Sequence, residues 1–124
     1  MSCNCNIDEN VLQITAGTTY TNTFTFEEDI SSYSGAIFTI RKDYQTAPVI
    51  QLNLSITDPH TIDLTIDKTE TANFTDFQNG KNSASYIWGL DLYDTTDNLQ
   101  VNVFPVTGEP APLCIVYKHV CGEQ

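Results

Sequence analysis

Two-residue alternation over short segments is the feature of this sequence that most limits its fold. The segment Thr19–Phe26 reads TYTNTFTF, with Tyr20, Asn22, Phe24 and Phe26 on one face and threonines on the other. Successive side chains of a strand point to opposite faces, so this pattern predicts a strand with one buried and one exposed face. Further strands are predicted at residues 11–14, 36–41, 49–54, 61–66, 83–93, 99–106 and 113–120.

Turn signals separate these segments at short intervals. Gly17, the Asp58-Pro59 pair and the Asn79-Gly80 pair each favour a reversal of the chain. Seven to eight short strands spaced in this way are typical of an all-β antiparallel sandwich or barrel. One short helix of at most two turns is predicted within 67–77, because Asp67 and Glu70 have the spacing of a capping box.

The length of the chain fits one domain, which we place at residues 1–124. The first ten residues show no strand pattern, and Thr107–Pro112 holds Gly108, Pro110 and Pro112. Segments 1–10 and 107–124 are therefore predicted as attachment arms, with a last strand inside the second one.

The balance of charge limits the kinds of partner. Sixteen acidic residues against five basic ones give a net charge of −11, which repels nucleic acids and anionic membrane surfaces. The sequence has neither an apolar run long enough for a membrane span nor a secretory signal at residues 1–10. We therefore expect synthesis in a cytoplasm, no nucleic-acid partner and no membrane partner.

No motif predicts catalysis, so we expect a protein that is not an enzyme. Glycine-rich phosphate loops, nucleophile elbows and zinc-protease motifs are absent from the sequence. His60 follows Pro59 in a predicted turn, where a solvated ring is the simplest interpretation. Asp91, Asp94 and Asp97 have two interpretations, a calcium site or a hairpin turn, and the turn is favoured because aspartate bonds its own backbone there.

Four cysteines form the candidate metal site. Cys3 and Cys5 lie near one end of the sequence and Cys114 and Cys121 near the other, with His119 two positions before Cys121. The first and last strands of a sandwich are often neighbours, so these side chains can converge. A structural zinc or iron–sulfur centre, disulfides and free thiols are the three interpretations, and each gives a structural clip on the termini. No other cofactor is predicted.

Exposed aromatic side chains are the candidates for binding a sugar. They are Trp88, Tyr86, Tyr93, Tyr33 and Tyr44. Trp88 shares its predicted face with Leu90 and Leu92 and is therefore expected in the core. Tyr44, in the loop sequence RKDYQTAP, is the best candidate for exposure.

Residues 7–104 resemble small virion proteins of tailed bacteriophages. The resemblance rests on ITAGTTYTNTFTF (Ile14–Phe26), DISSYSGAIFTIRKDYQTAPVIQL (Asp29–Leu52), TIDLTI (Thr61–Ile66), KTETANF (Lys68–Phe74) and YIWGLDLYD (Tyr86–Asp94). Similar domains stand at the N-terminus of phage baseplate upper proteins. The sequence departs from that pattern after Gly108, where Glu-Pro-Ala-Pro-Leu and a cysteine-bearing tail follow.

The resemblance implies an immunoglobulin-like β-sandwich and a non-enzymatic place in the virion. The expected function is that of a tail, baseplate or fibre-attachment component, joined to other virion proteins through strand edges and terminal arms. Many copies in a symmetric assembly are expected. Two alternatives stay open, a capsid decoration (cement) protein and a carbohydrate- or cell-surface-binding module.

Overall fold

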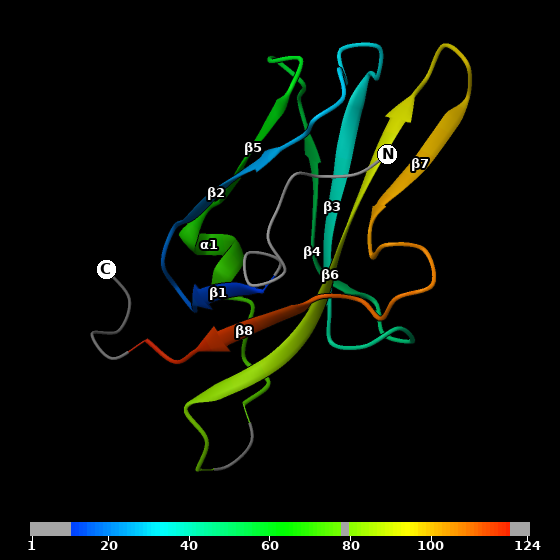
Figure 1. The fold of residues 1–124 in the computed structure, drawn as a ribbon. Coiled ribbons are helices and arrows are strands. Elements are labelled where there is room, and N and C mark those ends of the chain that lie inside the picture. Colours follow the sequence, from blue (N-terminus) through cyan, green and yellow to red (C-terminus); the bar gives the residue numbers. More distant parts are fainter. Residues whose placement is uncertain (1–10, 78–79, 120–124) are drawn as a thin grey trace.

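Eight strands and one helix make up the described part of the chain, residues 11–77 and 80–119 of a computed structural model. Figure 1 shows these elements. In order they are β1 (Leu12–Thr15), β2 (Tyr20–Thr25), β3 (Gly35–Arg41), β4 (Pro48–Leu54), β5 (Thr61–Ile66), α1 (Lys68–Thr71), β6 (Ser83–Asp94), β7 (Leu99–Phe104) and β8 (Leu113–Tyr117).

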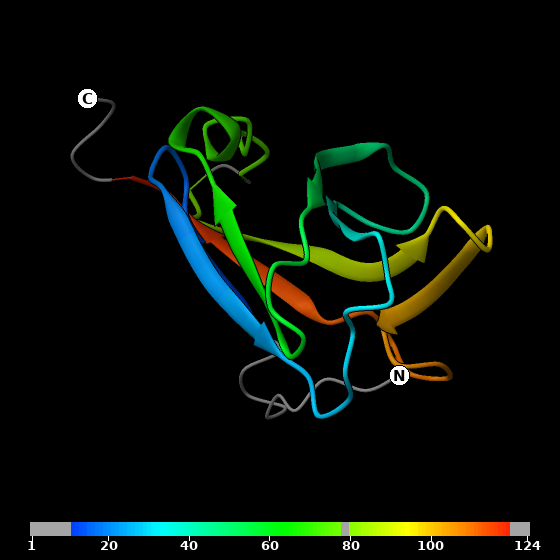
Figure 2. The same ribbon diagram turned by 90° about the horizontal axis from the view of Figure 1, so that it is seen from above.

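The strands form two sheets. The larger sheet has the order β1-β8-β6-β3-β4, with β7 also paired to β6, and the smaller one consists of β2 and β5. The smaller pair matches the B and E strands of an immunoglobulin domain, and β8-β6-β3-β4 match its G-F-C-C′ strands. The predicted immunoglobulin-like sandwich is therefore confirmed. Figure 2 shows β2 and β5 lying together on one side of β6 and β8.

One pair of the described strands departs from the predicted antiparallel arrangement. All other pairs are antiparallel, but β1 runs parallel to β8, with Leu12 opposite Cys114 and Thr15 opposite Tyr117. The turn at Gly17, with φ of +80°, leads the chain from β1 to β2 in the other sheet. The first strand therefore joins the last one without a hairpin between them.

Strand β6 organises the larger sheet because it is long enough to serve two partners on one edge. Its first half, Ser83–Ile87, pairs with β8, and its second half, from Leu90 to Asp94, pairs with β7. Strand β3 occupies the other edge from Gly35 to Arg41. In Figure 1 the long β6 ribbon runs past both partners.

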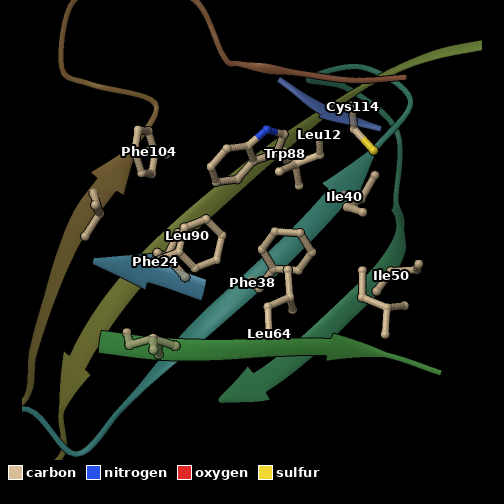
Figure 3. Packing of buried hydrophobic residues seen from close by; sticks show 14 of the residues in the cluster. Leu12, Phe24, Phe38, Ile40, Ile50, Leu64, Trp88, Leu90, Phe104 and Cys114 are labelled. Atoms are coloured by element: carbon tan, nitrogen blue, oxygen red, sulfur yellow. The ribbon is translucent and has the colours of Figure 1, made fainter. Parts of the chain in front are cut away.

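The predicted inward faces form the core. Phe24, Leu64, Trp88 and Leu90 are at most 3% exposed, and Phe38 is fully buried. The other buried apolar residues are Leu12, Ile14, Phe26, Ile30, Ala36, Ile40, Ile50, Ile62, Ile66, Phe74, Tyr86, Leu92, Val103, Phe104, Cys114 and Val116. Burial at every second position, as in β5 and β6, confirms the alternation seen in the sequence. Figure 3 shows this cluster between the sheets.

The helix is shorter than the limit set from the sequence. It has one turn, Lys68–Thr71, and the Asp67 side chain caps it by accepting a hydrogen bond from the Thr69 backbone N–H. The Thr71 hydroxyl is buried and donates to the Thr18 carbonyl oxygen over 2.6 Å, which ties the helix to the turn after β1. Ala72, Phe74 and Phe77 do not form a helical stripe, so nothing extends the helix.

Candidate functional site

Cys114 is the member of the predicted cysteine cluster whose position the structure describes. It lies on β8 with its side chain in the core and no exposed surface, and Figure 3 shows its sulfur directed into the cluster. Burial raises the pKa of this thiol to about 12. Cys114 therefore packs as a small apolar side chain and is a free thiol.

The other three cysteines, Cys3, Cys5 and Cys121, lie outside the described residues, so a metal or disulfide clip on the termini stays a prediction. Within residues 11–77 and 80–119 no group of three histidine, cysteine or acidic side chains has the geometry to hold a metal ion. His119, half-buried at the end of the described segment, has a buried Nδ1 atom without a hydrogen-bond partner.

The acidic and histidine candidates have local structural roles. Asp94 accepts a hydrogen bond from the Thr96 backbone N–H over 3.0 Å, which is the turn arrangement expected for the β6–β7 hairpin. The Asp91 carboxylate accepts a hydrogen bond from the Gln100 amide over 2.7 Å. His60 is exposed but not simply solvated, because its Nδ1 lies 3.2 Å and 3.1 Å from the carbonyl oxygens of Phe26 and Glu28.

The predicted attachment arms are partly described. Strand β8 (Leu113–Tyr117) is bonded to β1 on one side and to β6 on the other, so it belongs to the sheet. Residues 107–110 are exposed in the loop before it. Residues 1–10 and 120–124 lie outside the described part of the chain. In that described part no helix has the length and apolarity needed to cross a bilayer.

Sequence reasoning missed a groove on the outer face of the larger sheet. Its volume is about 360 Å³, and it lies over β3 and β6 beside β7 and the loop that follows β7. Gly89 forms its floor, where an outward side chain would otherwise stand. A Cβ atom at Gly89 would lie 3.0 Å from the Phe104 carbonyl oxygen, so glycine lets the end of β7 approach β6 closely.

Tyr44 lies at one end of this groove, and its predicted exposure is confirmed. Its side chain is 67% exposed, and its hydroxyl accepts a hydrogen bond from the Ala111 backbone N–H over 2.7 Å. Arg41 donates to the Thr46 carbonyl oxygen over 2.7 Å, and the Asp43 side chain accepts from the Gln45 N–H over 2.8 Å. These bonds hold the β3–β4 loop, and with it the tyrosine ring, in one position.

A second hollow continues the groove along the same face. It has a volume of about 380 Å³, shares Ile37 and Gln100 with the first, and extends to Asp94 and Asn98 on the β6–β7 hairpin. In the sequence, this face of the sheet is marked only by polar residues at outward strand positions, among them Gln51, Asn53 and Asn102. The alternation predicts which way they face but not that they surround a groove.

The edges of the sheets are the other candidate surfaces. Strand β4 ends the larger sheet, and β7 pairs only with β6 among the described strands. Neither strand has a charged residue: β4 reads PVIQLNL and β7 reads LQVNVF. Strands β1 (LQIT) and β2 (YTNTFT) also lack charge.

Comparison with known proteins supports the fold alone. No protein-family model matches the chain, and no curated protein matches it in sequence. Among solved structures it is similar to the full extracellular region of plexin A4, with 10% identity, a TM-score of 0.55 and 98% of this chain covered. The chain spans 10% of that plexin chain. The NK cell receptor NKp44 matches at 13% identity and a TM-score of 0.39, over 88% of this chain and 96% of the receptor chain.

Proposed function

We propose that this protein is a non-enzymatic structural protein whose copies join through strand pairing at the β4 edge. The virion setting comes from the sequence resemblance of residues 7–104, which favours a tail, baseplate or fibre-attachment component. The observation that carries the proposal is an edge strand without charge in a chain whose net charge is −11.

Charged side chains commonly protect an edge strand from pairing with another chain. Free backbone N–H and C=O groups at an edge bind other strands, and natural sheets block this with lysine, inward charges, proline or short edges. Strand β4 has seven residues, and its single proline, Pro48, stands at its first position. Val49, Leu52 and Leu54 are half-buried, so a strand added at this edge would also cover apolar surface.

A second copy of this chain is the partner that we assign to the edge. Two β4 strands related by a two-fold axis would pair antiparallel, and such an interface needs only one self-complementary surface. The many copies expected in a virion supply the partner at high local concentration. Strands β1, β2 and β7 are uncharged as well, but β4 is the longest of these four, so it offers a second copy the most backbone groups at little electrostatic cost in a chain of net charge −11.

Sedimentation of purified protein over a range of concentrations tests this proposal. We expect wild type to self-associate and Val49→Lys to remain monomeric, because the lysine would have to be buried beside the added strand. Ser32→Lys is the matched control, since it adds the same charge in an exposed loop and should associate like wild type. Circular dichroism verifies that each variant is folded.

A wild type that stays monomeric at every concentration, or a folded Val49→Lys that still associates, would reject pairing of copies at β4. The virion setting has its own test, mass spectrometry of purified phage particles from a genome that encodes the chain. Presence in many copies per particle supports it, and absence from intact particles contradicts it. A stable trimer on the capsid surface would favour the decoration-protein alternative.

A further inference from the structure

The groove on the outer face of the larger sheet has the chemistry of a ligand site that the proposed assembly role does not use. Its two hollows, about 360 Å³ and 380 Å³, lie within the size range of small-molecule sites. They share Ile37 and Gln100, so together they form one elongated depression along β3. An elongated ligand with several similar units fits this shape better than a compact one.

Carboxamides are the most frequent kind of polar side chain in the lining. They are Gln51, Asn53, Asn98, Gln100 and Asn102. Each carboxamide offers a carbonyl acceptor and two N–H donors, which is what a hydroxyl group, itself donor and acceptor, can use fully. Arg41 is the only cation that lines the described hollows, and Asp91 and Asp94 are the anions, so the lining does not select a strongly charged ligand.

Three of these amides are already held in place. Gln51 donates to the Thr39 hydroxyl over 3.2 Å, Gln100 donates to the Asp91 carboxylate over 2.7 Å, and Asn102 donates to the Pro105 carbonyl oxygen. Each bond uses one N–H and fixes the direction of the amide, leaving the amide oxygen and the second N–H to a ligand. A polar site that is oriented before binding loses less entropy when the ligand arrives.

Tyr44 supplies an aromatic face at one end of the depression. The bond from Ala111 N–H to its hydroxyl holds a ring that is otherwise 67% exposed. The C–H face of a pyranose packs well against such a ring, while its hydroxyls reach polar neighbours. By contrast Trp88 is 2% exposed, and its ring packs in the core against Phe24 and Phe38.

We propose that this groove binds a neutral oligosaccharide, with Tyr44 as the stacking residue and the carboxamides as the hydroxyl-binding residues. A peptide fits less well, because β3 beneath the groove is already paired with β4 on one edge and β6 on the other and cannot accept a further strand. A polyanion would meet Asp91 and Asp94 and the overall charge of −11.

A glycan array of neutral hexose and N-acetylhexosamine oligomers, followed by calorimetry with the best probe, tests the proposal. Maltohexaose and chitohexaose are the starting probes. We expect Tyr44→Ala and Gln100→Ala to weaken binding about tenfold each, as the loss of one stacking or hydrogen-bonding partner implies. Amide NMR shifts should change at Gly89 and Thr39, beneath the groove, when the sugar is added.

Tyr117→Ala and Gln13→Ala are the matched controls. They remove an exposed tyrosine and an exposed amide that line neither hollow, so binding should be unchanged. Failure of every neutral oligomer to bind the folded protein would overturn the proposal. Preference for acidic oligosaccharides, or equal losses in the control variants, would overturn it as well.

Discussion

The ring of Phe24 on β2 lies 5.6 Å from the ring of Trp88 on β6, and this contact joins the two sheets at the centre of the core. Phe38 on β3 completes the group, 5.8 Å from Trp88. In antibody domains a disulfide connects the same two strands, and a buried tryptophan packs against that disulfide. The second cysteine of the disulfide follows the tyrosine of the tyrosine corner by two residues. Here Tyr86 precedes Trp88 by two residues, so aromatic rings stand where those domains have the disulfide.

Replacing Trp88 with alanine should lower the free energy of unfolding by about 3–5 kcal/mol, because it removes the largest buried ring and leaves a cavity. Phe24→Ala should have a similar cost, and Phe24→Leu a smaller one because most of the volume is kept. Chemical denaturation measures these changes. Tyr44→Ala is the exposed aromatic control, and a Trp88→Ala variant as stable as that control would contradict the assigned packing.

Tyr86 should contribute through its hydroxyl as well as through its ring. The side chain is 2% exposed, and burial raises the pKa of its hydroxyl, while the backbone of Asp76, upstream of β6, acts on the pKa in the opposite direction as a hydrogen-bond partner would. Its place in β6 matches that of the tyrosine corner of immunoglobulin-like sandwiches, in which the hydroxyl bonds to the backbone a few residues upstream. Tyr86→Phe should cost about 1 kcal/mol of stability by denaturation, while Tyr117→Phe, exposed on β8, should cost nothing measurable. Equal effects of the two changes would argue against the corner.

The strands could be predicted because their alternation is local. Ile62, Leu64 and Ile66 in β5, and Tyr86, Trp88, Leu90 and Leu92 in β6, are buried as the period of two requires. The boundaries were less predictable. The last strand ends at Tyr117 instead of Val120, and β7 ends at Phe104, because pairing with β6 and not residue type decides where each strand ends.

The arrangement of the strands in space depends on contacts between distant segments, which the pattern of a single segment does not predict. The parallel pairing of β1 with β8 joins residues about a hundred positions apart in sequence. The groove needs Gly89 on β6, Tyr44 in one loop and Ala111 in another. Its amides looked unremarkable in the sequence, since asparagine and glutamine are ordinary on exposed strand faces. Gly89, a residue without a Cβ atom in a strand otherwise rich in large residues, is the one sequence feature that indicates a close approach of another backbone segment to β6.

Thr71 should be more important for stability than an average helix threonine. Its hydroxyl is fully buried and donates to the Thr18 carbonyl oxygen over 2.6 Å. Thr71→Val keeps the shape but leaves that carbonyl without this donor, so it should cost about 1–3 kcal/mol. Thr69→Val, at an exposed position of the same turn, should cost much less. Thr71→Ser keeps the hydroxyl and removes the methyl group, so it measures the methyl contribution separately; a Thr71→Val variant as stable as wild type would show that the bond to Thr18 contributes nothing measurable.

The buried thiol of Cys114 should make the stability of the protein fall at alkaline pH. Burial raises its pKa to about 12 in the folded state, from an ordinary value of 9.0. Above pH 9 the thiol ionises in the unfolded chain but stays protonated in the fold, so the unfolded state binds fewer protons and is favoured as pH rises. The stabilisation is complete below pH 9 and is lost between pH 9 and about 12.

Denaturation of wild type and Cys114→Ala at several pH values isolates this contribution, because the other titrating groups are common to both proteins. Their difference in unfolding free energy should be constant up to about pH 8, then shrink by roughly 1.4 kcal/mol per pH unit well above pH 9. The native thiol should also resist alkylation until the protein unfolds, since the thiolate is the reactive form. A difference that does not change with pH, or rapid alkylation of native Cys114, would place this side chain outside the core.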